Sequence, residues 1–93
     1  MNVSMVLFPI ADDCISILAV NTDHQQDCWE RRYATASQVS TGLEQIGMIK
    51  ASEAGELESD LMFLRGCPII KGVVEREDLE DAGFSPIVHK KTN

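Results

Sequence analysis

Apolar residues near the start of the chain fall into two short runs separated by a polar link. The first run covers residues 3–8 and the second covers residues 14–20, with Ala-Asp-Asp at positions 11–13 between them. Short runs that are partly β-branched are typical of buried strands, and such a link is typical of a turn. The pattern predicts a β-hairpin, with a single helix over residues 13–20 as the alternative.

The middle of the chain begins with the spacing of an amphipathic helix. Thr22 or Asp23 is positioned to cap this helix, because each has a glutamine three residues later. Ser, Thr and Gly between positions 35 and 42 favour turns, so the helix can break there, with Ser37 capping a second piece. The apolar residues that lie on one helical face are Trp29, Tyr33, Ala36, Val39, Leu43 and Ile46.

A separate helix is predicted to begin at Ser52 and to end at Gly66. Its apolar stripe consists of Ala54, Leu57, Leu61 and Leu64. A strand then follows over residues 68–74, and a short acidic helix over residues 75–82 ends at Gly83, with Phe84 folding back on Leu79. Ile87 and Val88 are predicted to form a final edge strand, which Pro86 precedes.

The predicted order of elements is therefore β-β-α-α-β-α-β. Helices gathered between strands indicate an α+β fold: a small, mostly antiparallel sheet with two main helices packed on one face. The 93 residues suffice for one domain, which we assign to residues 1–89, and residues 90–93 form a tail that is expected to fray. A chain of this size buries a modest core, so a homodimer is a reasonable expectation.

Negative charge is concentrated in the second half of the chain. Nine acidic and three basic residues between positions 51 and 82 give that stretch a net charge of −6, against −7 for the whole chain. Long-range charge of one sign favours partners of the opposite sign. The densest part of the stretch contains Glu75, Glu77, Asp78, Glu80 and Asp81, which we expect on an exposed face.

Residues able to support catalysis or metal binding do not form a recognisable motif. His24 and Cys28 are the closest pair of potential metal ligands, and neither has a paired motif around it, so we predict no metal site and no cofactor. The glycines do not cluster into a phosphate-binding loop. Cys67, between Gly66 and Pro68, is a candidate reactive thiol if Arg65 lowers its pKa and His89 acts as a base, although a buried structural thiol is the favoured interpretation.

Charge and composition exclude further classes of function. Two helices within residues 37–65 could mimic a helix-turn-helix, but the second carries four acids and one base and would repel DNA. No segment approaches the roughly 20 apolar residues that a membrane-spanning helix needs. Three irregularly spaced cysteines argue against a disulfide framework and for a cytoplasmic location.

The sequence thus favours a binding protein over an enzyme. The leading hypothesis is a small acidic interaction or regulatory module that binds a basic surface of a partner protein through Glu75, Glu77, Asp78, Glu80 and Asp81. Trp29 is the candidate anchor of a dimer interface, although core packing of its apolar stripe is the favoured alternative. The second hypothesis is a dimeric ligand-binding or enzymatic domain with a pocket near Cys67.

Overall fold

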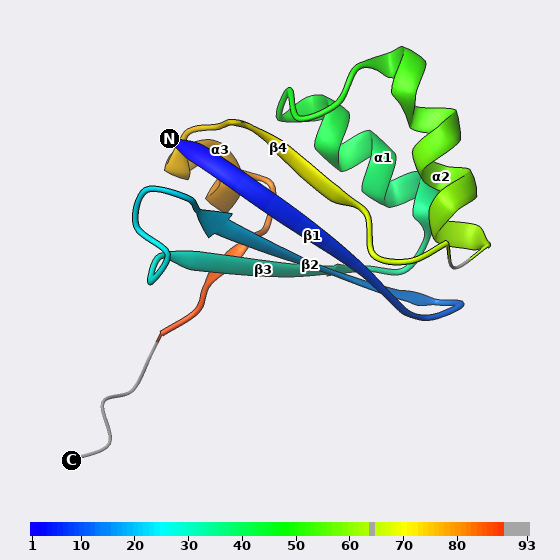
Figure 1. Cartoon of the computed structure of the whole chain (residues 1–93), viewed down its shortest axis with the longest axis horizontal. Helices are drawn as coiled ribbons and strands as arrows, with labels where there is room; N and C mark the ends of the chain where they lie inside the picture. The colour runs from blue at the N-terminus through cyan, green and yellow to red at the C-terminus, as the bar shows by residue number, and fades with distance from the viewer. Residues whose placement is uncertain (64, 89–93) are drawn as a thin grey trace.

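The computed structural model describes residues 1–63 and 65–88, which form an antiparallel sheet covered by helices (Figure 1). The five strands of the sheet lie in the order β4-β1-β2-β3-β5, and every neighbouring pair is antiparallel. The expected α+β class and the mostly antiparallel sheet are confirmed. In chain order the elements are β1 (Asn2–Ala11), β2 (Cys14–Asn21), β3 (Cys28–Tyr33), α1 (Ala36–Gln45), the 3-10 turn η1 (Ala51–Glu53), α2 (Ala54–Met62), β4 (Ile69–Val73), α3 (Arg76–Asp81) and β5 (Ser85–Pro86).

The predicted hairpin is present as β1 and β2, and the alternative helix over residues 13–20 is not formed. Val6 lies opposite Leu18, and the pairing continues to Pro9 opposite Ile15. The first strand therefore runs past Pro9 to Ala11, beyond the apolar run of residues 3–8 that predicts it. Side chains alternate between the two faces of such a pair, so Met5 and Ile17 are fully buried while their neighbours in sequence are not.

The prediction of a helix over residues 28–33 is wrong, because these residues form β3 against β2. Trp29 and Tyr33 are four residues apart, a spacing that fits one face of a strand as well as one face of a helix. Arg31 lies between them on that face and interrupted the apolar alternation that marks a strand. The added strand changes the order of elements to β-β-β-α-α-β-α-β.

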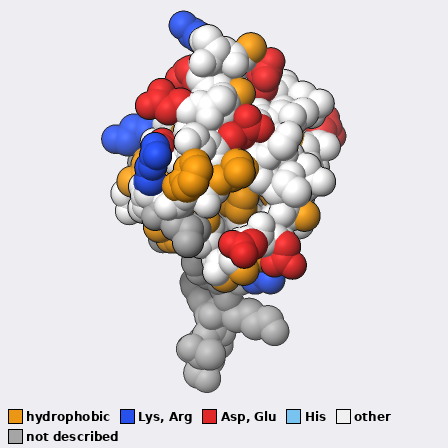
Figure 2. Space-filling model, turned by 90° about the vertical axis from the view of Figure 1, so that its right-hand side faces the viewer, with side chains coloured by type: hydrophobic (Ala, Val, Ile, Leu, Met, Phe, Trp, Pro, Cys, Tyr) orange, Lys and Arg blue, Asp and Glu red, His pale blue; other side chains and the backbone are white. Residues whose placement is uncertain are grey.

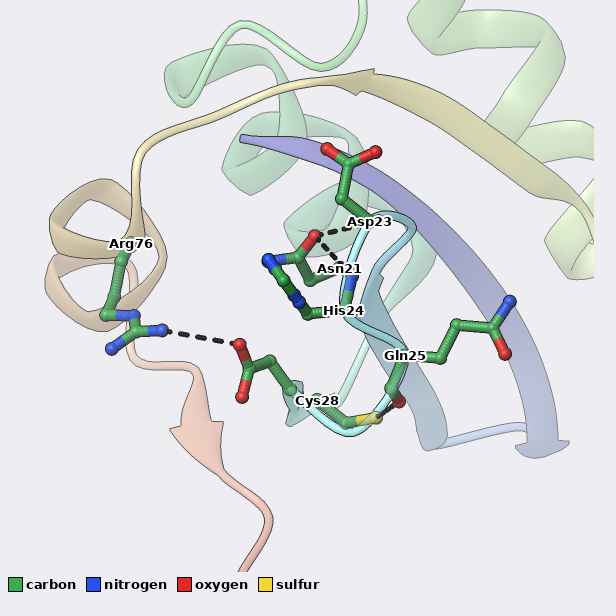
Figure 3. Close-up of polar contacts among 7 residues, drawn as sticks. Asn21, Asp23, His24, Gln25, Cys28 and Arg76 are labelled. Carbon is green, nitrogen blue, oxygen red and sulfur yellow. Dashed lines mark hydrogen bonds and ion pairs between the residues drawn. The ribbon is translucent and has the colours of Figure 1, made fainter.

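The turn before β3 is organised by Asn21, and neither Thr22 nor Asp23 caps a helix there. The buried Asn21 side chain accepts hydrogen bonds at Oδ1 from the backbone N–H groups of Asp23, at 3.0 Å, and His24, at 3.3 Å (Figure 3). An Asn side chain that bonds the backbone two residues ahead mimics a backbone turn. The chain therefore reverses here and returns along β2.

The two main helices, α1 and α2, pack side by side on one face of the sheet, as expected (Figure 1). Thr35 caps α1 by accepting a hydrogen bond from the N–H of Gln38 at 3.1 Å, in place of the predicted Ser37. Gly47 follows α1 with a φ of 76°, which suits a helix stop. The α2 helix ends at Met62, and Leu64 of its predicted stripe lies outside the described residues.

The core lies between this sheet face and the helices. Trp29, Tyr33 and Leu43 are at most 6% exposed and belong to it, which confirms that their stripe packs inside the domain. Burial raises the pKa of the Tyr33 hydroxyl above its ordinary value of 10.0, and the Arg31 guanidinium, 4.2 Å from the ring centroid, acts in the opposite direction.

The two strands that follow α2 in the chain, β4 and β5, lie at opposite edges of the sheet. β4 pairs with β1, whereas the two residues of β5 pair with β3 at the opposite edge. The edge strand was expected at Ile87 and Val88 and lies instead at Ser85 and Pro86. The predicted tail, residues 90–93, lies outside the described residues.

Candidate partner-binding site

The α3 helix, which carries the densest group of acids, is anchored to the core at both its centre and its end. Leu79 is fully buried and Phe84 is 3% exposed. The Phe84 N–H donates to the Leu79 carbonyl at 3.0 Å, and Gly83 adopts a φ of 89°, so the predicted helix stop is confirmed. Arg31 of β3 donates a hydrogen bond to the Ala82 carbonyl and holds the end of the helix. This short helix is therefore fixed to the body of the protein.

The acids that the sequence singled out are all exposed, from Glu75 through Asp81. Glu75 lies 4.0 Å from the N-terminal ammonium group. Within residues 1–63 and 65–88, no ion pair involves the other four, Glu77, Asp78, Glu80 and Asp81.

These four acids, which we call the α3 acidic surface, repel one another within the helix, and two of them lie at its unfavourable end. Glu77 is three residues from Glu80 and four from Asp81, and like charges at these spacings repel by about 0.2–0.5 kcal/mol per pair. Glu80 and Asp81 occupy the last turn, where the helix dipole favours cations, and no basic residue is present there. Glu77 and Asp78 lie in the first turn, where the helix dipole favours acids, so only Glu80 and Asp81 are acidic at positions that folding does not favour.

The acids around α2 differ because they have local partners. Glu53 accepts a hydrogen bond from the Lys50 N–H at 2.8 Å, and Glu58 accepts one from Ser40 Oγ at 3.0 Å. Asp60 lies 3.5 Å from Arg65. Glu56 is the exception, because it is exposed and forms no hydrogen bond or ion pair among the described residues. The stretch of net charge −6 therefore divides into acids that mostly have local partners around α2 and exposed acids on α3.

Trp29, the proposed anchor, lies beneath the start of α3 and is only 2% exposed. The guanidinium carbon of Arg76 is 5.4 Å from its ring centroid, and the same guanidinium forms an ion pair with Asp27 at 3.7 Å (Figure 3). The structure thus brings Trp29 close to the acidic helix. Its ring supports that helix from inside the domain and is not presented to a partner.

Cys67 is exposed in the segment before β4, which differs from the buried thiol favoured from the sequence. The nearby groove between α2 and β4 has a volume of about 340 Å³ and is lined by Glu53, Glu56, Asp60 and Lys71 together with apolar side chains. Cys67 does not line this groove. No cluster of three or more metal-ligating side chains occurs in the part of the chain that the structure describes.

Sequence reasoning missed the second face of the sheet. β1 and β2 were expected to be buried, yet the exposed face of the sheet bears Val6, Phe8 and Leu18. The signal was available, because both strands are apolar at odd and even positions while the chain contains only two main helices.

A smaller apolar group lies where the β1–β2 turn approaches the end of α2. Figure 2 shows apolar side chains gathered near the middle of this side of the molecule, with acidic side chains above and below them. Ile10, Met62 and Phe63 are each more than 60% exposed. A hollow of about 250 Å³ beside them is lined by Ala11, Asp12, Ile15, Ala36, Leu61 and Met62.

Comparison with known proteins adds no relative: no protein-family model, no curated protein and no solved structure shows significant similarity to this chain. Among the described residues, the helices are too short to cross a bilayer.

Proposed function

We propose that the protein is a binding module whose α3 acidic surface docks against a basic surface of a partner protein, in a reducing, cytoplasmic environment. The observation that carries this proposal is the placement of acids where they cost helix stability. Glu80 and Asp81 oppose the helix dipole, and among the described residues they have no ion-pair partner. A cation supplied from outside would compensate that cost.

The anchoring of α3 supports the same function. Leu79, Phe84 and the Arg31 hydrogen bond fix the helix, so binding does not have to order it. A pre-ordered surface loses less entropy on association than a flexible one. Complementary charges also steer a partner during encounter, which raises the association rate.

The test compares two variants of equal net charge. The first neutralises the surface with Glu77→Gln, Asp78→Asn, Glu80→Gln and Asp81→Asn. The control neutralises four exposed acids elsewhere with Asp12→Asn, Asp13→Asn, Glu44→Gln and Glu56→Gln. Partners are captured with the immobilised wild-type protein and purified, and their affinity for each variant is measured by titration calorimetry.

We expect the α3 variant to bind about 30-fold more weakly, at about 0.5 kcal/mol for each of four exposed ion pairs, while the control changes little. Chemical denaturation should show that the α3 variant differs from the wild type by less than about 1 kcal/mol, because the removed repulsion and the lost first-turn charges of Glu77 and Asp78 act in opposite directions. Equal losses in both variants would mean that diffuse net charge, and not α3, attracts the partner. Partner affinity that is unchanged in both variants and at high salt would refute electrostatic recognition.

A further inference from the structure

One face of the sheet has no helix over it within the described residues. Residues directly opposite each other in a sheet share a face, so Ile69, Val6 and Leu18 form an apolar row across β4, β1 and β2. Phe8 and Val20 extend this row, because each lies two residues from a member of it along the same strand. We call Val6, Phe8, Leu18, Val20 and Ile69 the open apolar face.

These side chains remain accessible to different degrees. Ile69 is 61% exposed and Phe8 is 38% exposed, whereas Val6, Leu18 and Val20 are partly buried by their neighbours in the sheet. A contiguous apolar surface of several hundred Å² on a soluble domain marks a site of association. The face is therefore a candidate interface on the side of the sheet opposite the core.

The distribution of charge indicates which kind of partner covers the open apolar face. The charged strand residues on this face are Glu30, Arg32 and Lys71, which give it a net charge of +1. The rest of a chain of net charge −7 then carries −8. A second copy of this chain is repelled when it approaches any acidic side, and least repelled when the two open faces meet. A basic partner would instead be drawn to the acidic sides.

We propose that the open apolar face is the interface of a homodimer in which two sheets stack face to face. Antiparallel sheets pack in this way about 10 Å apart with their inner side chains interdigitated. The α3 helix contributes Leu79 to the core on the opposite side of the sheet, so both copies keep their acidic surfaces accessible.

The area is sufficient for a specific contact. The strands β1, β2, β3 and β4 have 10, 8, 6 and 5 residues, and with a spacing of about 4.8 Å and a rise of about 3.3 Å per residue they cover roughly 450 Å² in projection. Two copies thus cover roughly 900 Å² in projection, and because the accessible surface of side chains exceeds its projection, the buried area is near about 1,000 Å², the lower bound for a biological interface. Affinity in the micromolar range is expected from an interface of this size, with mixed apolar and polar positions.

The experiment measures molar mass by sedimentation equilibrium between about 1 µM and about 500 µM, a range that brackets a micromolar dissociation constant. The wild-type chain should approach twice its mass of 10.3 kDa. Leu18→Glu places a charge at the centre of the face and should weaken the dimer by at least about tenfold. Ile69→Glu should act similarly, and because that side chain is 61% exposed the monomer keeps its fold.

Gln45→Glu is the matched control, because it adds the same charge at an exposed position on α1, away from the face.

A second measurement of dimer formation uses the alkylation rates of two cysteines. Cys28 lies on the open side opposite Val20, while Cys67 lies outside the strands of the sheet. Alkylation of Cys28 should slow as the protein concentration rises, and alkylation of Cys67 should not.

Three results would overturn the proposal. The first is a mass of 10.3 kDa at every concentration. The second is a dimer that survives both Leu18→Glu and Ile69→Glu. The third is a rate of Cys28 alkylation that stays constant over the concentration range in which the mass doubles, which would place the dimer contact on another face. None of these results bears on the α3 acidic surface, so the two proposals fail independently.

Discussion

At the scale of single residues, the closest fit in the core is between Gly42 of α1 and Tyr33 of β3. A Cβ atom added at Gly42 would lie 2.6 Å from the Tyr33 hydroxyl oxygen, whereas the ring carbons are 3.2 Å away or more. Tyr33 is buried, and its hydroxyl has no hydrogen-bond partner among the described residues. The glycine is therefore required by the hydroxyl and not by the backbone.

We predict that Gly42→Ala destabilises the protein by about 1–2 kcal/mol, because a clash of about 1–3 kcal/mol exceeds the gain in helix propensity of up to about 1 kcal/mol. In a Tyr33→Phe background the oxygen is gone, and most of this loss should disappear. Urea denaturation of the single and double variants measures the coupling between the two residues.

Gly55 provides the control for this comparison. It lies in α2, and an added Cβ there would meet nothing within 4 Å. Gly55→Ala should therefore stabilise the protein by about 0.5–1 kcal/mol. A Gly42→Ala penalty that is unchanged in the Tyr33→Phe background would show that another contact, and not the hydroxyl, excludes the methyl group.

At the scale of elements, the turn between β2 and β3 is organised by one buried side chain, that of Asn21. Asn21 is 5% exposed and accepts two backbone hydrogen bonds through one oxygen atom. Removing the acceptor leaves two N–H groups without that partner, and such a loss costs about 1–3 kcal/mol. We predict that Asn21→Ala destabilises the protein by this amount in urea denaturation.

The location of the effect is as informative as its size. The Asn21→Ala substitution should accelerate hydrogen exchange at the amides of Asp23 and His24 before it affects the core strands. Asn2→Ala is the control, because its exposed side chain forms only a long contact of 3.5 Å with Asp23 and should cost less than about 0.5 kcal/mol. Equal costs for the two substitutions would mean that the turn does not depend on Asn21.

The same turn shows why part of the fold could be predicted from the sequence and part could not. The hairpin, α1 and the stop of α3 each depend on local signals: short apolar runs, a helical period, and Gly83 before Phe84. The Asn21 turn is also a local signal, but β3 itself depends on its pairing with β2 and on Arg31, whose hydrogen bond goes to Ala82, 51 residues away. No local pattern encodes such a partner.

Some features of the candidate site could likewise be predicted from the sequence, and others could not. The exposure of the five acids between Glu75 and Asp81 followed from charge density alone, since five acids within seven residues are rarely buried. The burial of Trp29 was the favoured interpretation and is confirmed, but the element that carries Trp29 is β3 and not the predicted helix, because its pairing with β2 is a long-range contact. The open apolar face required the strand register, which pairs Val6 with both Leu18 and Ile69.

At the scale of the whole molecule, the two proposed surfaces differ in how they depend on charge. The α3 acidic surface attracts a cationic partner, so salt should weaken that complex. The open apolar face is close to neutral and joins two chains that each carry −7, so salt screens their mutual repulsion and should strengthen the dimer. Raising the salt concentration should therefore weaken the partner complex and strengthen the dimer.

We predict that raising sodium chloride from about 0.1 M to about 1 M, which shortens the Debye length from about 10 Å to about 3 Å, lowers the dissociation constant of the dimer severalfold. The same change should raise the dissociation constant of the partner complex by at least about tenfold, because its attraction is electrostatic. Sedimentation equilibrium measures the first constant, and titration with purified partner and the Ile69→Glu variant measures the second without interference from dimerisation. A dimer that dissociates as salt rises would require ion pairs to dominate its interface, and the apolar row of Ile69, Val6 and Leu18 could not then be its centre.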